Sequence, residues 1–142
     1  MPDQNIAAIS SVSARLAARV EAGTLTADPA QQSVAGALDG LLSDILAAGD
    51  RSILSRLTGR KKLQRGLYIH GGVGRGKTML MDIFFDLAPD QRKTRAHFHE
   101  FMADVHDRIN RFRTKLKAGE VKGDDPIPPV AREIAAETRL LC

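Results

Sequence analysis

The sequence predicts an α/β fold in which a parallel sheet is joined by crossover helices and preceded by an N-terminal helical segment. From residue 66 onward, short apolar runs alternate with stretches in which apolar residues recur every three or four positions. A glycine-rich loop also stands between the first of these runs and the helix that follows it. The predicted order is helix–helix–strand–loop–helix–strand–helix–helix–strand. We therefore divide the chain into a helical segment, residues 1–58, and the first part of an α/β core, residues 59–142.

The glycine-rich loop matches a known phosphate-binding pattern. Residues 71–78 read Gly-Gly-Val-Gly-Arg-Gly-Lys-Thr, a full match to G-x-x-x-x-G-K-[S/T], the P-loop or Walker A motif. The apolar run Gly66–Ile69 leads in as a buried strand would, and Thr78–Phe85 leads out at helical spacing. Motif and context together predict a P-loop NTPase fold that binds a nucleoside triphosphate together with Mg²⁺.

The residue types of the loop explain this chemistry. Backbone N–H groups at the positive end of a helix can hold a triphosphate, and glycines allow the close backbone approach that a Cβ would obstruct. Lys77, the candidate catalytic residue, supplies a mobile charge for the β- and γ-phosphates, and the Thr78 hydroxyl is the candidate Mg²⁺ ligand. Arg75 occupies a permissive position and receives no catalytic role. The residues expected to bind the nucleotide are Gly71, Gly72, Val73, Gly74, Arg75, Gly76, Lys77 and Thr78.

Two amphipathic helices are predicted ahead of the loop. The first spans residues 5–21; residues 5–22 superficially resemble an organellar transit peptide, but the acidic residues there favour a helix of the mature protein. The second begins at Asp28 as N-cap, with Gln31 completing a box-like cap, and closes at Gly49–Asp50.

Glycines inside the second helix and a short third helix complete this segment. Gly36 and Gly40 are unfavourable in a helix interior, so we expect another part of the protein to pack closely against them. The third helix is predicted around Ser52–Leu57.

Beyond the P-loop helix, which should stop at Ala88–Asp90, three further elements are predicted. Residues 95–99 alternate as in a strand, with His97 and His99 on one face. A helix follows from Phe101 to Lys117, residues 118–129 form a loop, and Val130–Thr138 is a short helix before a final apolar strand.

Composition and charge limit the class of protein. The net charge is +4, with 27% charged residues and one cysteine, so an internal disulfide is excluded and a reducing compartment, the cytoplasm, is expected. No apolar run approaches the roughly 18 residues needed to span a bilayer. The basic cluster Arg60–Lys62 is interpreted as a solvated loop, with a nucleic-acid patch as the alternative.

Other groups of polar residues give weaker evidence of a functional site. His97, His99 and His106 match no common zinc spacing and are interpreted as hydrogen-bonded or site-lining histidines. Glu100 could position a water molecule, although a surface place at the strand end is favoured. Asp82 and Asp86 share a helix face and are expected to be solvated.

Several segments together resemble a known family. Arg65–Thr78, followed by His-Phe-His-Glu-Phe-Met at 97–102, closely resembles the AAA+-like ATPase family that includes the bacterial cell-division protein ZapE and mitochondrial relatives. The lead-in Gly23-x-Leu25-x-x-Asp28-x-x-Gln31 is similar as well, so the resemblance covers the chain from about residue 12 onward. In the family, the final Leu-Leu-Cys continues into Phe-Asp-Glu-Phe, which supplies the metal-binding and water-activating carboxylates. We therefore expect an N-terminal fragment, with those carboxylates beyond Cys142.

The resemblance implies an ATPase whose hydrolysis acts on a protein partner, which for the bacterial relative is the division-ring polymer; an oligomer is possible. Three other functions remain open from the residues: a DNA-associated loader or initiator ATPase, a P-loop kinase of a small molecule, and an ATP-binding module without turnover. DNA binding with a steep salt dependence would favour the loader, and phosphate found on an acceptor rather than in water would favour the kinase.

Overall fold

The computed structural model describes residues 11–50, 65–89 and 92–142. It divides the chain into two compact units, Met1–Pro89 and Asp90–Cys142, each of which is described by itself. The predicted helix Ser52–Leu57 and the basic cluster Arg60–Lys62 lie outside the described residues. None of the helices in the described ranges is both long and apolar enough to cross a lipid bilayer.

The first helix of unit 1, α2, spans Val12–Glu21. Ser11 caps it: its backbone is extended, and its hydroxyl accepts the N–H of Ala14 at 3.0 Å. Asp39, one helix further on, also accepts the N–H groups of Val12 and Ser13 at 2.6 and 3.1 Å. The helix therefore begins at Val12, later than the expected residue 5, and residues 5–10 lie outside the described part of the chain.

The second helix, α3, spans Pro29–Asp50. Asp28 caps it as predicted, because its Oδ1 accepts the N–H of Ala30 at 2.8 Å. The box-like role expected of Gln31 is wrong. Its Nε2 donates instead to the carbonyl of Arg75 at 3.0 Å, and its buried Oε1 has no hydrogen-bond partner in the described part of the chain.

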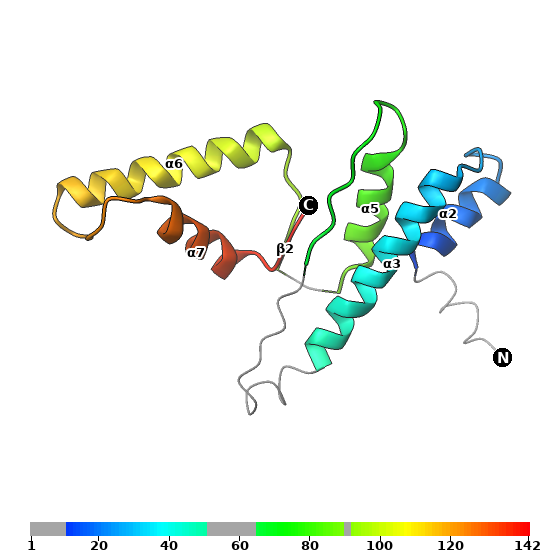
Figure 1. Cartoon of the computed structure of the whole chain (residues 1–142), viewed down its shortest axis with the longest axis horizontal. Coiled ribbons are helices and arrows are strands. Elements are labelled where there is room, and N and C mark those ends of the chain that lie inside the picture. Colours follow the sequence, from blue (N-terminus) through cyan, green and yellow to red (C-terminus); the bar gives the residue numbers. More distant parts are fainter. Residues whose placement is uncertain (1–10, 51–64, 90–91) are drawn as a thin grey trace. The chain divides into compact units, whose positions relative to one another are not determined.

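Helix α3 packs against both α2 and α5 (Lys77–Leu87), as Figure 1 shows. Helix α5 ends at Leu87, before Pro89, as predicted. The close packing expected around Gly36 and Gly40 is not observed among the described residues, since both glycines are exposed and no described atom comes within 4 Å of a Cβ built there. The buried apolar residues of unit 1 are Val12, Leu16, Ala35, Leu38, Leu42, Leu80, Ile83, Phe84 and Ala88.

The segment Gly66–Ile69 precedes the loop but forms no strand in this structure. Tyr68 is 89% exposed and Leu67 is 47% exposed, and the Tyr68 ring stacks on His70 with centroids 6.2 Å apart. A strand needs a hydrogen-bonded neighbour, and the sheet formed by the described residues contains β1 and β2 alone. The predicted buried strand is therefore not observed.

Unit 2 is a β–α–α–β arrangement. Strand β1 (Lys93–Thr94) pairs in parallel with β2 (Leu140–Leu141), with Lys93 opposite Leu140. The N–H of Ala96 donates to the carbonyl of Cys142 at 2.9 Å and extends the ladder. Because a parallel pair requires a crossover, the intervening helices α6 (Phe98–Lys117) and α7 (Ile127–Glu137) confirm the predicted parallel pairing for this part of the chain.

The strand predicted at residues 95–99 is wrong. Helix α6 begins at Phe98, and His97 is its N-cap. The Glu100 carboxylate accepts the N–H of His97 at 3.3 Å, and this bond favours the start of a helix over continuation of a strand.

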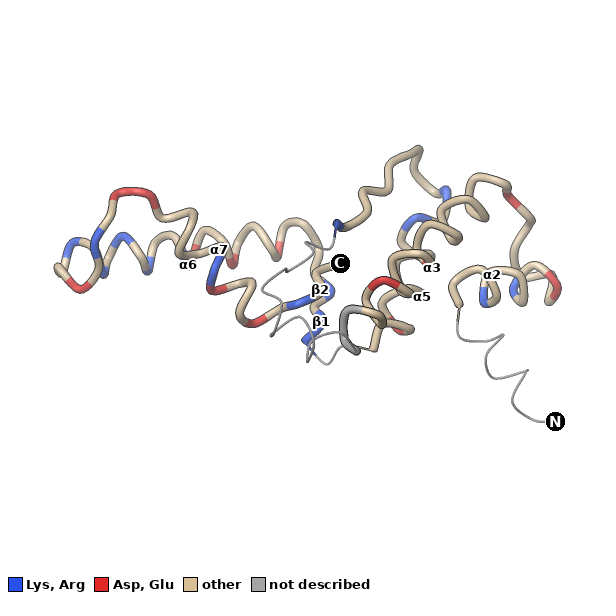
Figure 2. Tube along the Cα trace, turned by 60° about the horizontal axis from the view of Figure 1, so that its bottom comes forward, with Lys and Arg blue, Asp and Glu red and all other residues tan. Residues whose placement is uncertain are grey.

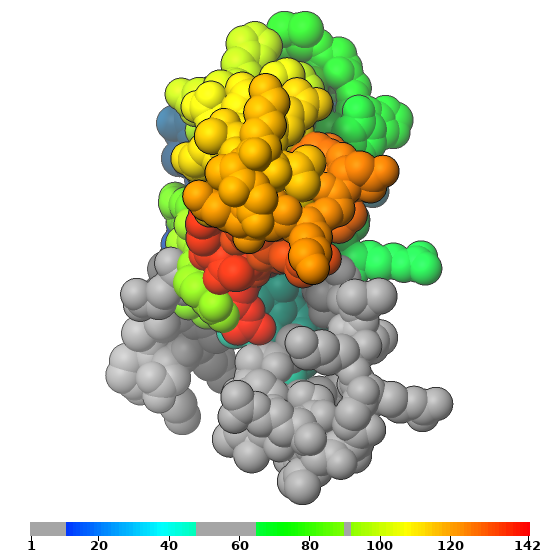
Figure 3. All heavy atoms as spheres, turned by 90° about the vertical axis from the view of Figure 1, so that its left-hand side faces the viewer, coloured from blue at the N-terminus to red at the C-terminus, as the bar shows by residue number. Residues whose placement is uncertain are grey.

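Helix α7 begins at Ile127, earlier than the predicted Val130. Prolines are tolerated in the first turn of a helix because the N–H groups there have no intrahelical partner. The Asp125 carboxylate accepts the N–H of Ile127 at 2.9 Å and helps to start the helix. In Figure 3 the yellow and orange atoms of α6 and α7 form a continuous surface.

Candidate nucleotide-binding site

The candidate site is the loop that connects the extended segment to α5 in unit 1. Two of its turns require glycine: Gly74 has φ +75° and Gly76 has φ +81°, in the left-handed region that side chains disfavour. No described atom lies within 4 Å of a Cβ built on Gly74, so conformation rather than space is what demands glycine there. Two glycines of the sequence pattern therefore lie where the backbone conformation of the loop requires glycine.

Helix α5 begins at Lys77, directly after this loop. Its N-cap is Gly76, which makes no side-chain cap, and the N–H of Leu80 donates to the Gly76 carbonyl at 3.1 Å. The N–H groups of the first turn have no partner inside the helix and carry its partial positive charge. This end of α5 is therefore suited to an anion.

The Lys77 side chain folds back over the loop. Its Nζ donates to the carbonyl oxygens of Gly71, at 2.9 Å, and Gly72. The ammonium is thereby held at the loop by backbone carbonyl oxygens. Thr78, the next residue of the helix, is exposed.

Arg75 points away from the loop. Its guanidinium forms an ion pair with Asp28 at 2.9 Å, and its side chain is 62% exposed. Hydrogen bonds from the Ala30 N–H and from Arg75 lower the pKa of the Asp28 carboxyl. The sequence predicted Arg75 as part of the loop and Asp28 as a helix cap, but not their pairing; the one available signal was the similarity of the lead-in around Asp28 and Gln31 to the family.

A cavity of about 360 Å³ adjoins this contact on the side of α2. Asp28 and Gln31 line it together with residues of α2 such as Leu16 and Val20. Asp28 and Gln31 therefore contact the loop through polar atoms and also border the cavity.

The remaining candidates are not brought together with the loop within unit 1. His97, His99 and Glu100 belong to unit 2 and are exposed around the start of α6. Among the described residues no group of three potential ligands could hold a metal ion. Asp86 is exposed, and Cys142 contributes backbone atoms to the β1–β2 ladder.

Comparison with known proteins identifies the family. A model of the AFG1-like ATPases matches residues 10–142, which is nearly the whole chain. The chain belongs to the AFG1-like ATPase family. A P-loop fold is what this family implies, and the two-stranded sheet of the described residues is a small part of such a fold.

Individual relatives agree with the family. Lactation elevated protein 1 homolog B of Danio rerio is 51% identical over 81 residues, which are 55% of this chain and 16% of the relative. Cell division protein ZapE of Escherichia coli is 45% identical over 78 residues, 55% of this chain and 19% of the relative. An uncharacterized protein of Schizosaccharomyces pombe is 29% identical over 160 aligned positions, 87% of this chain and 34% of the relative.

The chain thus spans about a sixth to a third of the length of the curated relatives that it matches. No solved structure was found to match it.

Proposed function

We propose that this chain binds ATP with Mg²⁺ through residues 71–78 and belongs to a protein that hydrolyses the ATP to act on a protein partner. The shape of the loop carries the proposal: two left-handed glycine turns lead into the N-terminus of α5, and the Lys77 ammonium lies on the loop carbonyls. A glycine-rich turn with a purely structural role would not need Lys77 and Thr78 at these positions.

The residues divide the work among backbone and side chains. Backbone N–H groups of the loop and of the first turn of α5 would hold the β-phosphate, and the glycines keep that approach open. Lys77 would neutralise charge on the β- and γ-phosphates, and Thr78 would hold Mg²⁺ through its hydroxyl. Magnesium supplies neutralisation of the charge that develops on the phosphates.

Hydrolysis and the partner rest on the family. The ZapE relative is named a cell division protein, so we propose that the partner is a protein of the division machinery and that the chain acts in the cytoplasm. Appearance of phosphate in water, rather than on an added acceptor, separates an ATPase from a kinase. An ATP-binding module without turnover would bind ATP and release no phosphate.

The test is the change Lys77→Ala. Loss of the ammonium should weaken binding of a fluorescent ATP analogue by at least about tenfold, or about 1.4 kcal/mol, measured by titration in Mg²⁺. Lys117→Ala, an exposed lysine of α6, is the control and should bind like the unchanged chain. An affinity for the analogue that is the same in Lys77→Ala as in the unchanged chain would rule out the site.

A further inference from the structure

Two side chains at the start of α3 reach the P-loop from far away in the sequence. Gln31 Nε2 donates to the carbonyl of Arg75 at 3.0 Å, across 44 positions. The Asp28 carboxylate accepts a hydrogen bond from the Arg75 guanidinium at 2.9 Å, across 47 positions. Arg75 is therefore bound at both its backbone and its side chain by two residues, the cap of α3 and a residue of its first turn.

The contact lies at the turn that gives the loop its shape. A Cβ built on Gly76 would lie 2.9 Å from Gln31 Nε2, so the amide lies directly against Gly76. Gly76 is also one of the two left-handed turns, with φ +81°. The side chain of Gln31 and the conformation of Gly76 are thus fitted to each other.

A hydrogen bond to the Arg75 carbonyl also fixes an amide of the loop. The carbonyl of Arg75 and the N–H of Gly76 belong to one planar trans peptide and point in opposite directions. When Gln31 holds that carbonyl toward α3, the Gly76 N–H must point away from α3. That N–H is one of the groups expected to meet phosphate.

Stability alone does not explain Gln31. Its Oε1 is buried and has no hydrogen-bond partner among the described residues, so within this part of the chain the amide bonds through its Nε2 alone. The neighbouring cavity of about 360 Å³ means that tight packing does not dictate the side chain on that side either. The hydrogen bond that the Gln31 amide makes is therefore the one to the loop, at the carbonyl of Arg75.

We propose that Gln31 and Asp28 are positioning residues that hold the P-loop in its nucleotide-binding conformation by binding Arg75. They act through Arg75 and Gly76 and do not touch the nucleotide themselves. The inference deepens the proposed function and rests on it, since the conformation that they hold matters only if the loop binds a polyphosphate.

Two variants test it against a matched control. Gln31→Met keeps the length of the side chain and removes the donor, whereas Asp28→Asn keeps an oxygen for the α3 cap and removes the charge that pairs with Arg75. Gln32→Met makes the same substitution at the next, exposed residue. Each is titrated with a fluorescent ATP analogue in Mg²⁺ and unfolded in urea without nucleotide.

The variants should change the affinity for the ATP analogue without a matching change in stability. We expect Gln31→Met to weaken the analogue by about tenfold with an unchanged or higher urea midpoint, Asp28→Asn to weaken it about threefold, and Gln32→Met to change neither. A loss of affinity that follows a loss of stability would mean a merely structural role and would overturn the proposal. So would wild-type affinity in Gln31→Met; the proposed function would stand in that case if Lys77→Ala still lost binding.

An NMR measurement without nucleotide keeps the inference testable whether or not ATP binds. The Arg75 carbonyl ¹³C and Gly76 amide ¹⁵N resonances should move in Gln31→Met and stay in place in Gln32→Met, because only the former loses the bond to that peptide. Unmoved resonances in Gln31→Met would overturn the proposal even if the chain binds ATP.

Discussion

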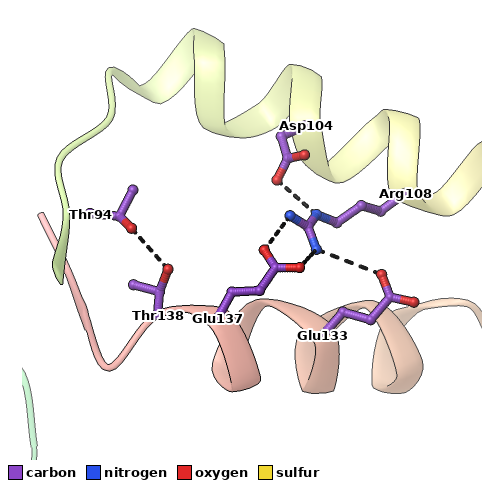
Figure 4. Close-up of polar contacts among 6 residues, drawn as sticks. All are labelled: Thr94, Asp104, Arg108, Glu133, Glu137 and Thr138. Carbon is purple, nitrogen blue, oxygen red and sulfur yellow. Dashed lines mark hydrogen bonds and ion pairs between the residues drawn. The ribbon is translucent and has the colours of Figure 1, made fainter. Parts of the chain in front are cut away.

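Arg108 lies on α6 with its guanidinium directed at carboxylates of both helices of unit 2 (Figure 4). Its Nε donates to Asp104 at 2.8 Å, its two terminal nitrogens donate to Glu137 at 2.9 and 2.7 Å, and Glu133 lies 3.6 Å away. The Arg108 side chain is 12% exposed, whereas the Glu137 side chain is 59% exposed. A bidentate pair on a sheltered arginine is stronger than an ordinary surface ion pair, although solvent at the carboxylates screens it.

Replacing this arginine should loosen the α6–α7 pair. Arg108→Met keeps the aliphatic stem and removes the charge, and we expect it to lower the free energy of unfolding by about 1 kcal/mol at pH 7. Urea unfolding followed by circular dichroism measures the change. Arg113→Met, on an exposed part of the same helix, should stay within about 0.5 kcal/mol of the unchanged chain.

The pH dependence follows from Glu137. Its pKa is lowered, chiefly by the hydrogen bonds from Arg108, so its contribution is present above the pKa of the unfolded chain and is lost as the pH falls through the lowered value. The stability difference between Arg108→Met and the unchanged chain should therefore be full at about pH 7 and should shrink as the pH falls below the ordinary pKa of a glutamate, about 4.5. An equal difference at neutral and at acidic pH would mean that the arginine acts through packing.

For individual residues, the sequence predicts interactions with residues that are close in the chain. Lys77 and Thr78 follow from the motif, and Asp28 follows from capping preference. Asp104 and Arg108 are four residues apart and could have been paired on a helix, but Glu133 and Glu137 could not have been added before α7 was known to fold back on α6. Gln31 was assigned to its own helix end for the same reason, because its true acceptor is 44 positions away.

Helix α3 carries two glycines that nothing in the described structure requires. Gly36 and Gly40 are exposed, have helical φ values, and leave open space where a Cβ would be. Glycine in a helix interior is less favourable than alanine because it loses more backbone freedom on folding. Gly36→Ala and Gly40→Ala should therefore each raise the free energy of unfolding by about 0.5–1 kcal/mol, measured in urea.

Gly74→Ala, in the same unit, should have the opposite effect on the free energy of unfolding. The space around it is equally open, but its φ is +75°, so alanine there should be destabilising. A destabilised Gly36→Ala or Gly40→Ala would show that another surface packs against α3 at these positions.

Some element boundaries that a cap or a proline marks were predicted correctly, and others were not. The end of α5 before Pro89 and the start of α3 after Asp28 are correct. Residues 95–99 alternate as in a strand, yet the cap formed by Glu100 starts α6 within that run. Gly66–Ile69 has the composition of a buried strand, but a strand also needs a pairing neighbour, which local sequence does not reveal.

For the chain as a whole, the parallel order was predictable and the full sheet was not observed. A parallel pair cannot be closed by a short turn, and the strand–helix–helix–strand order of residues 93–141 is compatible with the β1–β2 pairing that the structure shows. The P-loop fold itself is supported by the family, while the described residues show its loop, its helix and a two-stranded sheet.

The distribution of charge over the molecule argues against the remaining alternative, a DNA-associated ATPase. The net charge is +4, and the cations at the end of α6 are followed closely by Glu120, Asp124 and Asp125. Figure 2 shows basic and acidic residues side by side where α6 turns toward α7. Alternating signs do not build the extended positive field that holds a phosphate backbone.

We therefore expect duplex DNA to bind weakly, with a dissociation constant no tighter than about 10⁻⁶ M at 50 mM salt, and to be lost by about 200 mM. Fluorescence anisotropy of a labelled duplex measures this, with and without ATP. Changing Arg60, Lys61 and Lys62 together to Gln should remove most of the residual binding if that cluster contributes it. Submicromolar binding that persists at about 200 mM salt and depends on ATP would instead favour the loader, because such affinity requires contacts beyond the release of counterions.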